Sequence, residues 1–173
     1  MVLVGGNQAP DLPKEAEMDR YEFLKTLPFK YGSKLDTKLS TTEEAKLIRA
    51  DIKEAVKTGL LPKAKYSVRT KYFSGGSSID VRISDVKTPI INLDWIERVM
   101  TEAHWQYNTP ACMKYTDTGR SILWTVEAIV NQYNFDKSEP MVDYFFVNFY
   151  SSVEYNWQWE RSITESLKTA YTG

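Results

Sequence analysis

The chain of 173 residues is long enough for one domain with a hydrophobic core and marginal for two. Its 42% hydrophobic and 26% charged residues are ordinary for a soluble globular protein, and 22 basic against 23 acidic residues leave a net charge of -1. This balance excludes a global field that attracts nucleic acid or a membrane, so any basic surface must be a local patch. The single cysteine, Cys112, excludes an internal disulfide and fits a reducing compartment.

Residues 1–39 predict an N-terminal arm followed by a short helix. Two glycines and two prolines fall within residues 1–14, which show no period. Residues 15–27 place Met18, Tyr21 and Leu24 at helical spacing, and Pro28 ends the helix because the residue before a proline is pushed out of the α region. The chain start resembles no signal peptide, and no stretch approaches the roughly 18 apolar residues of a membrane span. We therefore expect a soluble, cytoplasmic protein without membrane contact.

A strong helix is predicted between Ser40 and Gly59, opening a single domain over residues 40–173. Ser40 with Glu43, or Thr41 with Glu44, has the spacing of a capping box. Apolar residues then repeat at helical spacing at Ala45, Ile48, Ile52, Ala55 and Val56. Gly59 is placed as the left-handed residue that ends the helix.

A β-hairpin is predicted over residues 65–85, KYSVRTKYFSGGSSIDVRISD. Side chains alternate on both sides of a glycine-bearing turn, which is typical of paired strands with one buried face. Gly75 and Gly76 can adopt the positive φ that a tight reversal needs. The face expected to be buried carries Tyr66, Val68, Thr70, Tyr72, Ile79, Val81 and Ile83.

Two further helices are predicted after the hairpin. The first is capped by Asn92 or Asp94, and its buried stripe is Ile96, Val99, Met100, Ala103 and Tyr107. The second is capped by Asp117 or Thr118 and extends to about Tyr133, with the stripe Ile122, Val126, Ile129, Val130 and Tyr133.

A second hairpin is predicted over residues 143–160, with Ser151 and Ser152 at its turn, and a last short helix over residues 161–169. Aromatic and polar residues alternate on both sides of the two serines. Two hairpins with helices packed on one face make an α+β fold with one antiparallel sheet.

The stretch KYSVRTKYFSGGSSIDVRIS, with the preceding helix, resembles the large polyvalent protein-associated domain numbered twenty-nine. The later run VEAIVNQYNFDKSEPMVDYFFVNFYSSVEYNW, residues 126–157, resembles the C-terminal part of the same group. Members occur in phages, conjugative elements and bacterial genomes. The resemblance covers roughly residues 45–160 and supplies no activity. It implies a phage or mobile-element accessory protein that acts in the cytoplasm of a bacterial host cell.

The residues that could perform catalysis do not converge in the sequence. His104 is the only histidine, so it cannot build a usual zinc site, and Cys112 has no nearby partners for a triad. Acidic residues cluster around one connector at Asp136, Glu139 and Asp143. They could hold Mg²⁺ with a phosphate substrate, or form a solvated turn. We predict no catalytic residue, no metal and no cofactor.

The first hairpin carries a local basic patch that could hold DNA or RNA. Arg69, Lys71 and Arg82 are expected to project from the outward face, with Phe73 beside them to stack on a base. The alternative is that these cations only keep an exposed sheet face soluble and block edge pairing. The residues predicted for nucleic-acid binding are Lys65, Arg69, Lys71, Phe73 and Arg82.

The second predicted hairpin is aromatic with mixed polar residues, which suits a protein partner. Burial on both sides would explain its aromatic residues equally well. The residues predicted for protein binding are Tyr144, Tyr150, Tyr155 and Trp157. The leading hypothesis is a non-enzymatic module that binds a host protein or protein complex, with counter-defence against restriction or CRISPR systems as one role. The alternative is a nucleic-acid-binding protein that uses the first hairpin.

Overall fold

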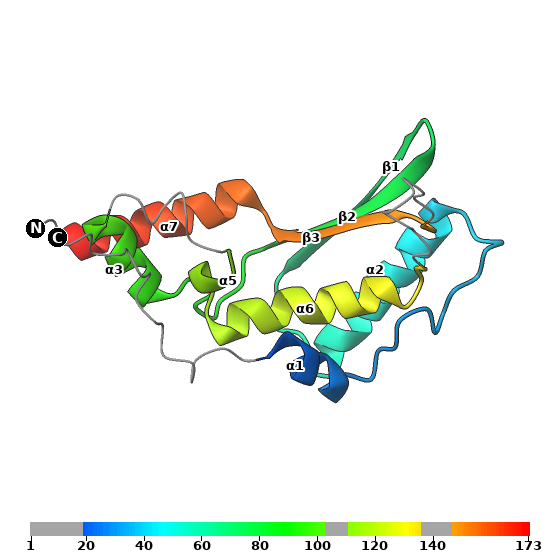
Figure 1. The fold of residues 1–173 in the computed structure, drawn as a ribbon, viewed down its shortest axis with the longest axis horizontal. Coiled ribbons are helices and arrows are strands. Elements are labelled where there is room, and N and C mark those ends of the chain that lie inside the picture. The colour runs from blue at the N-terminus through cyan, green and yellow to red at the C-terminus, as the bar shows by residue number, and fades with distance from the viewer. Residues whose placement is uncertain (1–18, 103–110, 136–146) are drawn as a thin grey trace, which may run out of the picture.

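The chain folds as an α+β protein with one three-stranded sheet (Figure 1), which confirms the predicted class. A computed structural model describes residues 19–102, 111–135 and 147–173. The elements are α1 (Arg20–Thr26), α2 (Thr41–Lys57), β1 (Lys65–Phe73), β2 (Gly76–Ser84), α3 (Leu93–Thr101), α5 (Ala111–Lys114), α6 (Asp117–Asn131), β3 (Tyr150–Tyr155) and α7 (Trp157–Thr172). Within these ranges, no helix combines the length and the apolar character that crossing a membrane requires.

Helix α2 forms where the sequence predicts it. The backbone N–H of Ser40 donates to the Glu43 carboxylate at 2.7 Å, and the Ser40 hydroxyl accepts from the Glu43 N–H at 3.3 Å, which is the predicted capping box. Gly59 has a φ of +83° and follows the C-cap. Ile48 and Ile52 are buried, so the apolar stripe of α2 faces the core.

The first hairpin is also confirmed. Strands β1 and β2 pair antiparallel, with Val68 opposite Val81 and Phe73 opposite Gly76. The turn is made by Ser74 and Gly75, and the φ of +91° at Gly75 is one that glycine adopts without steric cost.

The sheet is mixed, which corrects the prediction of an antiparallel sheet. Strand β3 runs parallel to β2, with Ser78 opposite Tyr150 and Ile83 opposite Tyr155, and the strand order is β1-β2-β3. A parallel pair cannot be joined by a tight turn and needs a long crossover. The chain segment that contains α3, α5 and α6 supplies this crossover.

The second predicted hairpin is wrong from Ser151 onward. Ser151 and Ser152 lie inside β3, which continues to Tyr155, and residues 157–160 of the expected return strand begin α7 instead. The Asn156 side chain caps α7 by accepting a hydrogen bond from the Trp159 N–H at 3.1 Å. Of the predicted first arm, residues 143–146 lie outside the described residues, and residues 147–149 precede β3 and belong to none of the three strands. The predicted C-terminal helix exists and begins four residues earlier, at Trp157.

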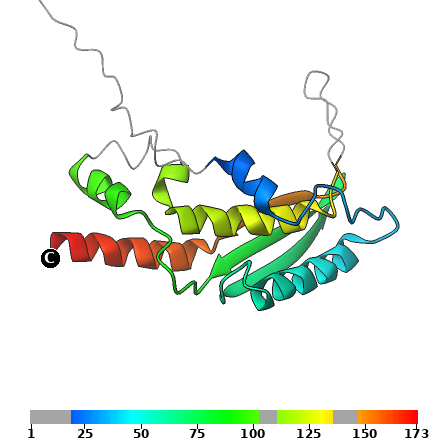
Figure 2. The same ribbon diagram turned by 90° about the horizontal axis from the view of Figure 1, so that it is seen from below.

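Helices α2 and α6 pack on one face of the sheet, which we call the inner face (Figures 1 and 2). The core between them contains side chains from both helices and from the sheet, including Ile48, Ile52, Ile79, Val81, Val126 and Ile129. Helix α7 leaves the end of the sheet and packs against α3, as Figure 1 shows.

The remaining helix starts differ little from the predictions. Asn92 caps α3, and its side chain accepts from the Asp94 N–H at 3.0 Å. Helix α6 is capped by Thr116 rather than by Asp117 or Thr118. Helix α1 lies on α6, where the rings of Phe23 and Trp124 are 5.8 Å apart.

Candidate binding surface

The face of the sheet opposite α2 and α6, which we call the outer face, is the candidate binding surface. No described residue on this face is buried, whereas Val68, Ile79, Val81 and Ile83 on the inner face are. An antiparallel hairpin commonly leaves one face to solvent, so this surface is open to a partner. The strand register places on it Lys65, Ser67, Arg69, Lys71, Phe73, Ser78, Asp80, Arg82, Tyr150, Ser152 and Glu154.

All five residues predicted for nucleic-acid binding lie on the outer face, but their charges are not equally available. Lys71 Nζ lies 3.3 Å from an Asp80 carboxylate oxygen. Arg82 lies 3.5 Å from Glu154 and donates to the Ser152 hydroxyl at 2.7 Å. Lys65 and Arg69 are exposed and form no ion pair with any residue in the described ranges. The charge available to a ligand is therefore concentrated on β1.

Two aromatic residues meet at the turn end of the outer face. The ring centroids of Phe73 and Tyr150 are 5.9 Å apart, with 37° between the ring planes, and both side chains are exposed. A Cβ at Gly76 would lie 3.2 Å from Phe73 Cε2 and 3.4 Å from Tyr150 Cε2. Gly76 therefore provides the space that this pair occupies. The structure brings together one residue predicted for nucleic-acid binding and one predicted for protein binding.

The other residues predicted for protein binding do not join this surface. Tyr155 is 2% exposed, and its hydroxyl donates to the backbone oxygen of Gly119 at 2.7 Å, which removes it from the expected surface. Trp157 is exposed, in the first turn of α7. Tyr144 lies outside the described residues.

Helix α2 adds a row of cations that the sequence analysis missed, which we call the α2 basic stripe: Lys46, Arg49, Lys53 and Lys57. They are three, four and four residues apart, which places them on one side of the helix. This spacing is visible in the sequence and could have predicted the stripe. Arg49 Nη2 donates to the backbone oxygen of Val68 at 2.6 Å, so this side of α2 borders β1. All four are exposed, and none forms an ion pair with another described residue.

Hydroxyl groups fix the turn end of the hairpin to the start of α2. The Tyr72 hydroxyl accepts a hydrogen bond from the Thr42 N–H at 3.1 Å and lies 3.0 Å from the Thr42 hydroxyl. These bonds favour the phenolate and hold the pKa of Tyr72 below its ordinary value. The hydroxyls of Thr41 and Ser77 are 2.7 Å apart and buried. The basic stripe and β1 are therefore held in a fixed relation.

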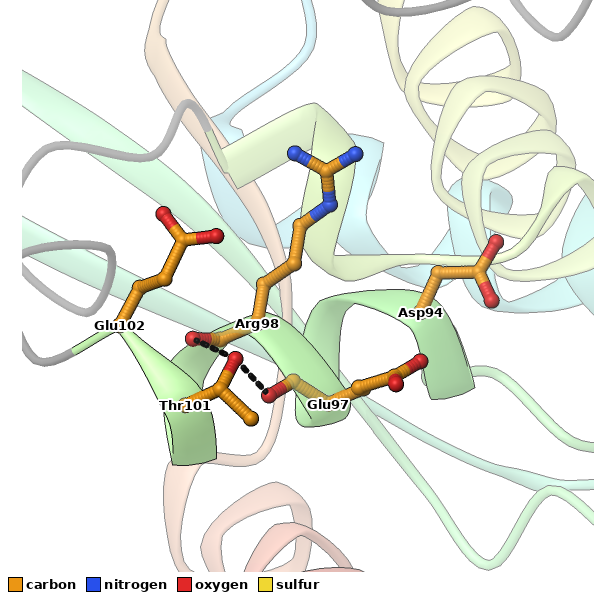
Figure 3. A pocket seen from close by; sticks show the side chains of 5 residues that line it. All are labelled: Asp94, Glu97, Arg98, Thr101 and Glu102. Atoms are coloured by element: carbon orange, nitrogen blue, oxygen red, sulfur yellow. Dashed lines mark hydrogen bonds between the residues drawn. The ribbon is translucent and has the colours of Figure 1, made fainter. Parts of the chain in front are cut away.

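A shallow hollow on α3 is a weaker candidate. It is lined by Asp94, Glu97, Arg98, Thr101 and Glu102. Figure 3 shows that the ionisable side chains spread from the helix and do not converge on one point. The Thr101 hydroxyl donates to the Glu97 backbone oxygen at 2.9 Å, so it is engaged within the helix itself. This arrangement does not define a site.

The residues considered for catalysis or metal binding are not placed by the structure. His104, Asp136, Glu139 and Asp143 lie outside the described residues, and of Cys112 only the backbone position in α5 is described. Within the ranges 19–102, 111–135 and 147–173, no group of three or more His, Cys, Asp or Glu side chains could hold a metal ion.

Comparison with known proteins gives no match to a family model, to a curated protein or to a solved structure. The resemblance to the phage and mobile-element domain therefore stays a prediction.

Proposed function

We propose that this protein is a non-enzymatic binding module that docks an anionic macromolecule through the outer face and the adjoining side of α2. The observation that carries the proposal is the gathering of cations around β1 in a chain whose net charge is -1. On β1 and the α2 basic stripe, the exposed cations without an ion-pair partner among the described residues are Lys46, Arg49, Lys53, Lys57, Lys65 and Arg69. Such a local field steers and orients an anionic partner even when the whole protein is nearly neutral.

The groups on the outer face support binding rather than bond-breaking chemistry. They are cations, hydroxyls, aromatic rings and two carboxylates, and these carboxylates of Asp80 and Glu154 lie beside Lys71 and Arg82. The host-cell setting and a counter-defence role rest on the sequence resemblance. In that setting, the module would inhibit a host protein or complex by covering an acidic surface of it.

Single-stranded nucleic acid is the second candidate partner, and the Phe73–Tyr150 pair favours it. Proteins hold single strands by combining cations along the backbone path with aromatic rings that stack on bases. Arg69 and Lys71 share the outer face with the pair. The outer face therefore has both elements of a single-strand platform.

Two anionic probes test the proposal: a fluorescently labelled oligo-dT strand and labelled poly-glutamate, each titrated with protein at low salt and then at rising salt. We expect at least one probe to bind with an affinity that falls as salt rises. The variant Lys65→Ala/Arg69→Ala should weaken binding and flatten the salt slope, by about 0.7 for each phosphate of a single strand that the protein no longer neutralises. The matched control is Arg161→Ala, an exposed cation on α7.

The outcomes separate the candidates. Oligo-dT binding that depends on both Arg69 and Phe73 supports the nucleic-acid candidate. Binding of poly-glutamate alone supports an acidic protein partner. If neither probe binds at low ionic strength, the anionic-partner proposal is wrong and the cations only keep the sheet soluble.

A further inference from the structure

Strand β1 has a free edge whose direction follows from the register. Phe73 and Gly76 flank a two-residue turn, so they form a hydrogen-bonded pair, and the same holds for every second pair along the ladder. The backbone groups of Tyr66, Val68, Thr70 and Tyr72 therefore point away from β2. The bond from Arg49 to the Val68 oxygen agrees, because it reaches that oxygen from outside the sheet.

This edge is open in the part of the chain that the structure describes. The strand order is β1-β2-β3, so β1 pairs with β2 alone. The bond from Arg49 occupies one carbonyl of the edge. A long edge of unpaired N–H and C=O groups is a template for another strand unless charges block it.

The charges around the edge select what could pair there. A strand added to β1 would direct alternate side chains to the two faces of the sheet. On the outer face they would lie beside Lys65, Arg69 and Lys71; on the inner face they would approach the α2 basic stripe. Cations thus border the edge on both sides, and opposite charges on neighbouring strands stabilise pairing.

The same charges disfavour a second copy of this chain. Antiparallel pairing of β1 with itself about Arg69 would place the two Arg69 side chains opposite each other, and a second α2 basic stripe would be brought near the first. Like charges directly opposite each other destabilise a strand pair. The edge therefore fits a different chain with acidic side chains.

We propose that β1 accepts an extended acidic segment of a partner protein as a fourth strand of the sheet. The inference rests on the proposed function and narrows the anionic partner to a protein. Main-chain hydrogen bonds to Tyr66, Thr70 and Tyr72 and to the Val68 N–H would supply affinity, and the cations on both faces would supply selectivity. Four edge residues at alternate positions span about seven residues of a partner strand.

A labelled peptide of about eight alternating Glu and Thr residues is the probe, measured by fluorescence anisotropy against the full chain. A methylated peptide carries a backbone N-methyl group on every residue, with its side chains unchanged. No N–H group then remains to face β1 in either register. We expect this peptide to lose at least about tenfold in affinity, because it loses the main-chain bonds.

Protein variants test the same edge from the other side. Thr70→Pro removes one outward N–H from an edge strand, a position where proline is tolerated, and should weaken peptide binding. Lys46→Glu/Lys53→Glu should weaken it by about tenfold or more through charge reversal, whereas Arg161→Glu on α7 should not. A thermal unfolding curve identifies any variant that fails to fold, and the methylated peptide tests the unaltered protein.

Each outcome decides. Loss of affinity on full methylation supports strand addition. Equal binding of the methylated and parent peptides overturns it. If oligo-dT binds and the parent peptide does not, the strand inference is wrong while the anionic-partner proposal stands. If neither binds, both are wrong.

Discussion

Glu43 and Glu44 are neighbours in the first turn of α2, and the pKa values of their carboxyl groups move in opposite directions. Glu43 is exposed, and its hydrogen bonds with Ser40 hold its pKa below the ordinary value of 4.5. Glu44 is 1% exposed, and burial raises its pKa, although Asn148 donates to its carboxylate at 2.6 Å. The surroundings of Glu43 therefore stabilise its charged form, whereas the surroundings of Glu44 destabilise its charged form.

The pH dependence of stability should separate these two residues. The pKa of Glu43 is lower in the folded than in the unfolded protein. The Glu43 carboxyl therefore adds to folding stability above about pH 4.5, and this stabilisation is lost as pH falls through the folded pKa. Glu43→Gln should therefore lower the melting temperature at pH 7 and have a smaller effect near pH 3. The pKa of Glu44 is higher in the folded than in the unfolded protein. The contribution of the Glu44 carboxyl to folding stability is therefore present below about pH 4.5 and is lost as pH rises through the folded pKa.

Glu44→Gln should accordingly raise the melting temperature relative to the parent at pH 7, and the advantage should shrink toward pH 4. The glutamine oxygen can still accept the hydrogen bond from Asn148, so the substitution changes charge with little change of shape. Melting curves across pH 3 to 8 provide the measurement. Parallel pH profiles for the two variants would contradict the opposite shifts.

Ile52→Ala tests the packing of α2 on the sheet. Ile52 is 3% exposed in the core that α2 shares with Val81 and Ile129. The truncation should cost about 2–5 kcal/mol of unfolding free energy, measured by urea denaturation. Leu47→Ala, on the exposed side of the same helix, is the matched control and should change stability far less. An unchanged urea midpoint for Ile52→Ala would show that α2 does not pack in the core.

Gly119→Ala should destabilise the protein although alanine is the better helix former. A Cβ at Gly119 would lie 2.7 Å from the backbone oxygen of Ile90, which already accepts a bond from the Thr116 N–H. We expect a cost of about 1–3 kcal/mol from this overpacking. Ser121→Ala, two residues later in α6, should stay within about 0.5 kcal/mol. Equal stability of the parent and Gly119→Ala would show that α6 can shift away from Ile90.

The contact between Phe73 and Tyr150 can be tested with substitutions that leave every charged side chain in place. Phe73→Ala should weaken oligo-dT binding by about 1–3 kcal/mol if that strand binds, because stacking is lost. Gly76→Ala should weaken it less, since its Cβ only pushes the rings of Phe73 and Tyr150 apart. Both variants should keep the melting temperature near that of the parent. Tyr171→Ala on α7 is the control for an exposed aromatic residue away from the sheet.

The sequence predicted those elements that are determined by residues close to one another in the chain, namely α2 and the β1–β2 hairpin. The capping box at Ser40 and the turn at Gly75 act over a few residues, so α2 and the hairpin could be predicted. Val68, Ile79, Val81 and Ile83 are buried as expected, whereas Tyr72, predicted on the same buried face, is 62% exposed at the turn end. The outer-face positions of Arg69 and Arg82 follow from the same alternation.

The pairing of β3 depends on contacts between residues about 70 positions apart, for which the sequence has no local signal. Ser151 and Ser152 are typical of turns, and Tyr155, Trp157 and Trp159 continue an apparent alternation. The competing signal was helical: after the capping residue Asn156, apolar residues recur every four positions at Trp159, Ile163 and Leu167, and this stretch forms α7. The same long-range pairing carries Tyr150 to Phe73, so the aromatic pair could not be predicted from sequence.

The parallel pairing of β3 has a consequence for the order of folding. The β1–β2 hairpin closes over a two-residue turn, whereas β3 can dock only after the crossover through α3, α5 and α6 has been brought into place. Contacts between distant residues form late, because loop-closure entropy must be overcome first. The Phe73–Tyr150 contact spans that late step, so it should appear only as the native state is reached. Its ring contact would then serve as a spectroscopic reporter of the completed sheet, while far-ultraviolet signals follow the helices and the hairpin.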